Sequence, residues 1–168
     1  MNKIMIKNGL YKLNEEGLKF LDSYKCQIAK NYNETKLQTR PIFFAMSSDL
    51  HKDILYMIPL TTIRSVEQEV RIKEYLSSSG FQQNFYEEVK ILGEKRILKI
   101  SSVFVVSTSM VNEWTINGII YEVRNKITLN SIEKKLNIMI NHYAANPNRS
   151  ENHIIELRDN LFSIIKNK

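Results

Sequence analysis

Apolar residues form short runs through the middle of the chain and recur at helical spacing toward both ends. A short run that is apolar throughout or alternates with polar residues is typical of a strand, and an apolar residue at every third or fourth position is typical of a helix. The pattern predicts an extended segment over residues 3–13 and strands over residues 41–46, 53–60, 85–92, 96–100, 102–107, 114–116 and 119–123.

Two helices are predicted in the first half of the chain from their capping residues. Asn14 precedes two glutamates and begins a helix that continues to about residue 32, because an asparagine cap and acidic first-turn residues favour a helix start. Ser65 and Gln68 have the spacing of a capping box and begin a second helix that stops at Ser79-Gly80. The inward side chains predicted for this second helix are Val66, Val70 and Leu76.

Two further helices are predicted at the end of the chain. One begins near Asn130 or Ser131, and the other follows Pro147 with Ser150 as its cap. Between the strands, the polar segment 47–52 predicts a hairpin with a longer loop, Gly93-Glu94 predicts a tight turn, and Asn117-Gly118 is a strong hairpin signal. The sequence therefore predicts an α+β fold: a strongly bent antiparallel sheet or small β-barrel with inserted and C-terminal helices, in a single domain over residues 1–168.

Composition narrows the class of protein. The chain has 168 residues, 43% of them hydrophobic, and a net charge of +6 from 24 basic and 18 acidic residues. This basic balance favours polyanionic partners such as nucleic acid. A single cysteine, Cys26, leaves no intramolecular disulfide. No secretory signal and no membrane-spanning apolar stretch is seen, so we predict a soluble cytoplasmic protein with no membrane partner.

The segment from Ile58 to Arg64 carries the strongest candidate chemistry. An apolar strand runs directly into Thr61, Thr62 and Arg64, just before the predicted capping box. Two hydroxyl groups and a permanent cation near a helix N-terminus suit a phosphate group. The alternative is structural, because Thr-Thr also closes strands and caps helices in many proteins.

Other catalytic constellations are missing from the sequence. The three histidines, His51, His142 and His153, lack metal-ligand spacing, and no Gly-rich phosphate loop or nucleophile elbow occurs. We therefore predict no metal site and no cofactor. His51 is placed in the loop between two strands, either as a solvated turn residue or as a general acid or base. Hydroxyl groups, Lys and Arg suit RNA cleavage by its own 2′-OH, in which the protein stabilises a dianionic phosphorane.

The order of these motifs resembles the ToxN/AbiQ superfamily, the endoribonuclease toxins of type III toxin-antitoxin systems, and is nearest to the CptN or TenpN branches. The resemblance covers roughly residues 11–143 and rests on Tyr11-x-Leu13 before a helix, Arg40-Pro41 at a strand, Ile58-Pro59-Leu60-Thr61-Thr62, and a late Val-Phe-Val-Val strand.

The resemblance implies a MazF/PemK-like barrel and metal-independent RNA cleavage that leaves a 2′,3′-cyclic phosphate. It also implies inhibition by a small pseudoknot antitoxin RNA, cut by the toxin from a repeat precursor and held in a closed protein–RNA assembly. The family's catalytic positions fall on Thr61, Thr62, Arg64 and Arg40. Thr62 replaces a serine, and the two arginines replace lysines, so neither arginine is a plausible general base.

Two matters stay open from the residues alone. The proton acceptor is a hydroxyl, His51, Lys36 or the substrate phosphate. The alternatives to a type III toxin are a non-catalytic RNA-binding module and a MazF-type toxin with a protein antitoxin. The residues predicted to contact RNA are Lys36, His51, Lys52, Lys95, Arg96 and Lys126.

Overall fold

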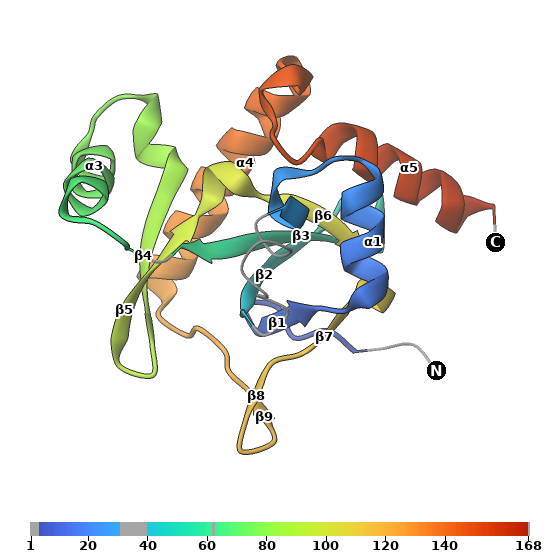
Figure 1. Cartoon of the computed structure of the whole chain (residues 1–168), viewed down its shortest axis with the longest axis horizontal. Coiled ribbons are helices and arrows are strands. Elements are labelled where there is room, and N and C mark those ends of the chain that lie inside the picture. The colour runs from blue at the N-terminus through green and yellow to red at the C-terminus, as the bar shows by residue number, and fades with distance from the viewer. Residues whose placement is uncertain (1–3, 31–39, 62, 168) are drawn as a thin grey trace.

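A computed structural model describes residues 4–30, 40–61 and 63–167 of the chain. Helices surround one large antiparallel sheet, and a small separate hairpin projects from it (Figure 1). The described strands are β1 (Leu10–Leu13), β2 (Ile42–Ser48), β3 (His51–Thr61), β4 (Tyr86–Ile91), β5 (Glu94–Lys99), β6 (Phe104–Ser107), β7 (Val111–Glu113), β8 (Thr115–Ile116) and β9 (Ile119–Ile120). The described helices are α1 (Glu15–Ser23), α3 (Val66–Ser77), α4 (Lys126–Ala145) and α5 (Ile154–Lys166), with 3₁₀ turns η1 (Phe81–Phe85), η2 (Ile100–Ser102), η3 (Thr108–Met110) and η4 (Pro147–Arg149).

Strand β3 organises the sheet because it pairs along both edges. One edge pairs with β2, while the other pairs first with β6 and then, at Leu60 and Thr61, with β5. The strand order is β4-β5-β3-β2-β1-β7, with β6 beside β3. Strand β3 passes from β6 to the β4–β5 hairpin along its length. No pairing among the described strands joins β4 to β7, so the described sheet is open. The α+β class is confirmed, whereas the predicted small β-barrel is not.

The core lies on both faces of β3, which explains why that strand is apolar without alternation. Residues 54–59 are all buried. Helix α5 packs on β3 and β6, α1 on β1 and β6, and α4 on β2 and β4. Helix α3 lies apart over the β4–β5 hairpin, where Ile72, Tyr86 and Ile97 form a second small core.

Three helix predictions were wrong in detail. Helix α1 ends at Ser23, because Lys25 adopts a left-handed φ of 58° before helical backbone resumes at residues 27–30. Helix α4 begins earlier than predicted, at Lys126, because Asn125 caps it. On α3, Val66 and Val70 point outward with 76% and 49% of their surface exposed, and Ile72 is the buried residue.

The turns follow the residues that tolerate positive φ. Asn117 and Gly118 have φ of 53° and 80° and join β8 to β9, as predicted. The β4–β5 turn is Leu92-Gly93, one residue before the predicted pair, since Ile91 pairs with Glu94. The β2–β3 loop is shorter than predicted, since Ser48 pairs with His51, and His51 therefore belongs to β3. Within the described ranges, no helix combines the length and apolar character needed to cross a membrane.

Candidate functional site

The C-terminal end of β3 places Thr61 between two neighbouring strands, and in Figure 1 this end points toward the β4–β5 hairpin. On one edge, Thr61 pairs with Ile97 of β5. On the other edge, Ile42 pairs with Pro59. Arg40 lies two residues before Ile42 and Thr61 two residues after Pro59, so both extend from the same end of the β2–β3 pair.

The connection from β3 to α3 fixes the backbone around Arg64. The Gln68 N–H donates to Ser65 Oγ at 3.1 Å, which confirms the predicted serine cap. The reciprocal bond is different from the prediction: Gln68 Oε1 accepts from the Arg64 N–H at 2.7 Å. The Arg64 side chain is exposed in the connection that follows the strand. Arg64 is therefore held by its backbone, with an exposed guanidinium close in the chain to Thr61.

Strand β5 adds two lysines on the side of Thr61. Paired residues share a face of a sheet, and side chains two residues apart on a strand do so as well. Lys95 and Lys99 flank Ile97 and so lie on the same face as Thr61. Lys95 Nζ lies 3.5 Å from Glu88 Oε1, while Lys99 is half-buried and forms no ion pair with the described carboxylates. The sequence analysis missed Lys99, which the alternation around Ile97 would have indicated.

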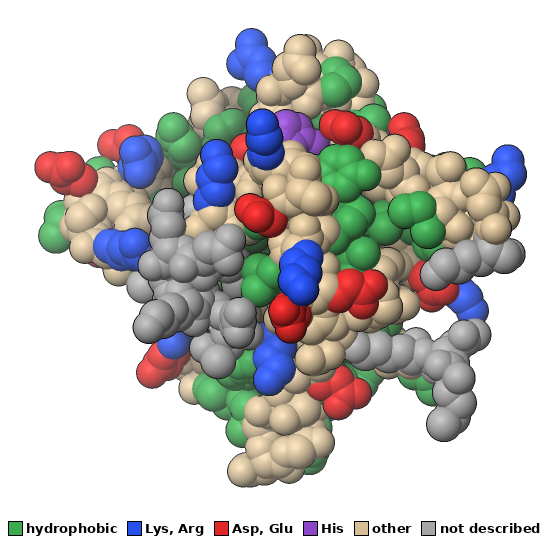
Figure 2. Space-filling model, turned by 45° about the vertical axis from the view of Figure 1, so that its right-hand side comes forward, with side chains coloured by type: hydrophobic (Ala, Val, Ile, Leu, Met, Phe, Trp, Pro, Cys, Tyr) green, Lys and Arg blue, Asp and Glu red, His purple; other side chains and the backbone are tan. Residues whose placement is uncertain are grey.

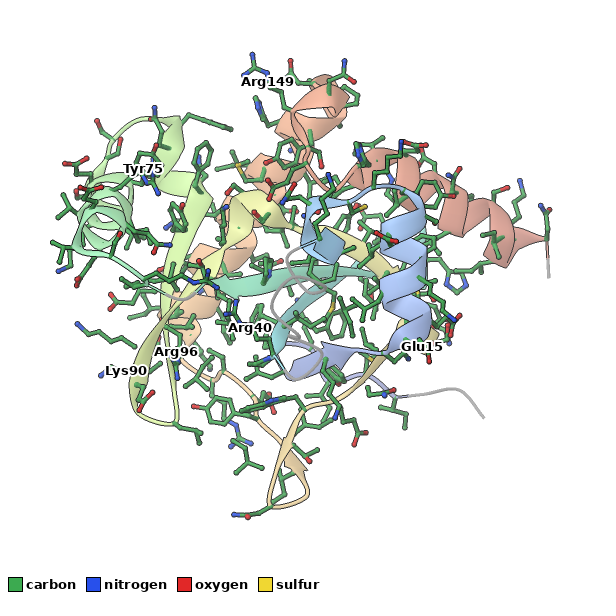
Figure 3. All side chains as sticks on the ribbon, in the orientation of Figure 1. Glu15, Arg40, Tyr75, Lys90, Arg96 and Arg149 are labelled. Carbon is green, nitrogen blue, oxygen red and sulfur yellow. The ribbon has the colours of Figure 1, made fainter. Side chains whose placement is uncertain are left out.

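Arg96 lies on the opposite face from Lys95, because adjacent residues of a strand alternate. Its Nη2 donates to Glu94 Oε2 at 2.9 Å. The structure therefore separates the predicted Lys95 and Arg96 pair, and only Lys95 shares the face of Thr61. In Figure 3, Arg40, Arg96 and Lys90 occupy the same part of the view, around the β4–β5 hairpin and the adjoining end of β3.

His51 and Lys52 lie at the other end of β3. Thr61 lies ten positions after His51 in this strand, which corresponds to roughly 30 Å. His51 Nδ1 accepts from the Asp53 N–H at 3.0 Å and lies 3.8 Å from Asp53 Oδ2. The prediction that His51 lies in a loop was wrong, and its position excludes it as an acid or base at Thr61.

Of the remaining predicted site residues, the structure describes Lys126 but not Thr62 or Lys36. Lys126 is exposed at the first position of α4, beside the cap Asn125. Thr62 and Lys36 lie outside the described residues. Within the part of the chain that the structure describes, no three His, Cys, Asp or Glu side chains gather as a metal-ligand set.

The small core beneath α3 supports this end of the sheet. Tyr86 pairs with Lys99 and packs with Ile72 and Ile97. Burial raises the pKa of the Tyr86 hydroxyl, and the Arg71 guanidinium opposes that shift. Tyr86 is thus held neutral as part of the support for β5.

One face of the molecule carries both signs of charge. On the face that Figure 2 shows, Lys and Arg side chains are interspersed with Asp and Glu side chains. The net charge of +6 is therefore not concentrated on the described part of this face.

Comparison with known proteins leaves the family open. No protein-family model matches the chain, and no curated protein matches it. Among solved structures, it is similar to an endoribonuclease in complex with its cognate antitoxin from Mycobacterial species, at 11% identity and a TM-score of 0.42, over 82% of this chain and 96% of that one. A likeness at this level assigns no family and no activity, and the resemblance to the ToxN/AbiQ superfamily stays a prediction.

Proposed function

We propose that this chain is an endoribonuclease toxin that cleaves RNA by attack of the substrate's own 2′-OH. The observation that carries the proposal is at the end of β3, where the β3–β5 register gives Thr61 the same sheet face as Lys95 and Lys99. Two further cations lie nearby along the chain: Arg64 follows Thr61 by three residues, and Arg40 precedes the first paired residue of β2 by two. A rigid strand end presenting a hydroxyl near cations suits an anionic phosphate and the phosphorane formed from it.

In the proposed reaction, the 2′-oxygen attacks the adjacent phosphorus and the bond to the 5′-oxygen breaks. The products are a 2′,3′-cyclic phosphate and a 5′-hydroxyl. The Thr61 hydroxyl donates to a phosphate oxygen, and Arg40 and Arg64 stabilise the monoanionic phosphorane. The proton of the 2′-OH passes to a non-bridging oxygen of the phosphate, which is one of the acceptors that the sequence left open.

The leaving 5′-oxygen needs a proton, and Lys99 is the group we assign to this step. An ammonium group donates a proton to a developing alkoxide, whereas a guanidinium group does not give up its proton in practice. The cyclic product returns a proton to Lys99, which restores the starting state. The assignment follows from Lys99 sharing the face of Thr61, two residues from its partner Ile97.

The regulatory part of the proposal follows the resemblance. A type III toxin is inhibited by a structured RNA that it processes itself, in a closed protein–RNA assembly. This part is tested by expressing the chain from DNA that includes the region upstream of its gene and then purifying the protein with whatever binds it. A discrete RNA of uniform length that resists high salt supports an RNA antitoxin, whereas a small co-purifying protein selects a MazF-type toxin instead.

The nuclease activity is tested with purified protein and a defined RNA in the presence of EDTA. Thr61→Val keeps the shape of the side chain and removes its hydroxyl, and Arg64→Ala removes the exposed cation. We expect each to lower kcat/KM for cleavage by about 10²-fold or more, with Lys166→Ala on α5 as the control. RNA that binds but stays intact with the wild type selects the non-catalytic RNA-binding module.

A further inference from the structure

A hollow lies between the β4–β5 hairpin and the β8–β9 hairpin, and it shares Lys95 with the candidate site at the end of β3. Its volume is about 680 Å³, within the range of small-molecule binding sites. One side is apolar, formed by Leu92 together with Ile116, Ile119 and Ile120. The backbone leading into α4 closes the other side, with Asn125 and Thr128 in the lining. The hollow therefore has an apolar side and a polar side, which suits a ligand that has both an apolar part and a polar part.

The charged lining has an excess of positive charge. Three basic residues and two glutamates line the hollow. Both glutamates are paired, Glu88 with Lys95 at 3.5 Å and Glu122 with Arg124 at 3.8 Å. Lys90 has no such partner among the described carboxylates, and it stands directly opposite Lys95 in the β4–β5 register. Like charges placed opposite each other destabilise a sheet, and a bound anion would relieve this repulsion.

Tyr121 holds the two sides of the hollow together. Its hydroxyl accepts from the Leu92 N–H at 3.1 Å and donates to the Lys90 carbonyl at 3.3 Å. Its own carbonyl accepts from the Leu10 N–H of β1 at 2.9 Å. The aromatic ring in the lining is therefore fixed at both ends, and a fixed ring binds a planar partner with little loss of conformational entropy.

The hollow adjoins the candidate site through β5. Lys95 lines it and lies two residues from Ile97, the partner of Thr61. That separation is roughly 7 Å along the strand, and Lys95 and Thr61 share one face of the sheet. An RNA strand with one phosphate at Thr61 can thus place a neighbouring nucleotide in the hollow. The start of α4, whose first turn has no acidic residue, contributes Asn125 and Thr128 to the lining of the hollow.

From this arrangement we infer that the hollow is a nucleotide subsite that binds an RNA nucleotide next to the scissile phosphate. The base lies against the apolar side and Tyr121, while Lys90 and Arg124 meet the phosphate of that nucleotide. The inference rests on the proposed function and adds to it a place where one flanking base is selected.

Calorimetric titration of the full chain with AMP, GMP, CMP and UMP, and with inorganic phosphate, tests the subsite. Lys90→Gln removes the unpaired cation, and Ile119→Ser changes a side chain that is 72% exposed, so both variants are expected to fold. The matched controls are Lys166→Gln and Ile164→Ser, both on α5. The Ile164 side chain is 51% exposed. We expect at least one nucleotide to bind, with affinity lowered about fivefold or more in both subsite variants and unchanged in both controls.

The same variants in RNA cleavage separate this inference from the proposed function. A changed preference for the flanking base in Lys90→Gln and Ile119→Ser supports the subsite. Cleavage by the wild type without nucleotide binding, or with equal binding in all variants, overturns the subsite and leaves the nuclease standing. Inorganic phosphate that binds as tightly as the nucleotides also overturns it. Nucleotide binding that both variants lose, without any RNA cleavage, supports the subsite and overturns the nuclease.

Discussion

Lys135 of α4 and Glu87 of β4 form an ion pair with Nζ and Oε2 at 2.8 Å, and only 14% and 16% of their side-chain surfaces are exposed. The Ser131 hydroxyl donates to the same Glu87 oxygen, and Lys135 Nζ also donates to the Tyr86 carbonyl at 2.9 Å. These bonds attach the edge strand β4 to the longest described helix. Strand β4, which forms one side of the proposed nucleotide subsite, is therefore held in place by its contacts with α4.

Glu87→Ala is expected to destabilise the protein substantially. It leaves the Lys135 ammonium largely buried without its carboxylate, and loss of one partner from such a pair costs about 3 kcal/mol of unfolding free energy. Urea unfolding measures the change. Adding Lys135→Met should recover most of it, because an apolar side chain of similar length removes the unpaired charge.

Glu133→Ala provides the matched control on the same helix. Glu133 pairs with Lys7 at 3.9 Å, and both side chains are more than half exposed. Exposed pairs contribute about 0–1 kcal/mol, so this variant should unfold close to the wild type. Equal destabilisation by Glu87→Ala and Glu133→Ala would contradict a special role for the buried pair.

Asn152→Ala is expected to loosen the packing between three distant segments. The fully buried Asn152 accepts from the Ile28 N–H at 2.9 Å and donates to the Ser102 carbonyl at 2.8 Å. Leaving such groups buried and unsatisfied costs about 1–3 kcal/mol each. The drop in thermal midpoint should exceed that of Asn141→Ala, an exposed change on α4. Equal midpoints for the two variants would show that the Asn152 bonds contribute nothing net.

Features set by neighbouring residues in the chain were predicted from the sequence, whereas features set by distant residues were not. The β3 strand and the Asn117-Gly118 turn follow from residues adjacent in the chain, and both were predicted. The side-chain bonds of Asn152 join residues up to 124 positions apart. Lys99 likewise joins the site only through the register between β3 and β5. The change of partner along β3, from β6 to β5, was not predicted for the same reason, because a local pattern contains no information on partner choice.

Stability is expected to fall steeply at alkaline pH. Burial raises the pKa of the Cys26 thiol and of the Tyr143 hydroxyl to about 12, from 9.0 and 10.0, and burial also raises the pKa of Tyr11. The native state therefore keeps protons that the unfolded state loses. The contribution of these groups is complete below their unfolded pKa values and is lost as the pH rises from about 9 to about 12.

Urea midpoints between pH 8 and pH 11 measure this dependence. Tyr143→Phe removes one titrating group and should flatten the decline, although it also removes the bond from Tyr143 to the Ser101 carbonyl at 2.7 Å and so lowers stability at pH 8. Parallel curves for the variant and the wild type would exclude Tyr143 as a source of the decline. The native Cys26 thiol should also resist alkylation at pH 8 and react only after unfolding.

Lys99 and His51 give opposite expectations for RNA cleavage. Lys99→Met removes the ammonium that we assign to protonating the 5′-oxygen, and loss of a general acid lowers kcat by about 10²-fold or more. His51→Ala should leave kcat within about twofold of the wild type, because His51 lies at the other end of β3 from Thr61.

A substrate with a 5′-thio leaving group distinguishes proton donation from a structural role. A thiolate leaves without a proton, so Lys99→Met should cleave this substrate nearly as fast as the wild type if Lys99 is the acid. Equal loss on both substrates would assign Lys99 to positioning or charge stabilisation instead. A large loss in His51→Ala would place the chemistry at the other end of β3, and the Thr61 assignment would then be wrong.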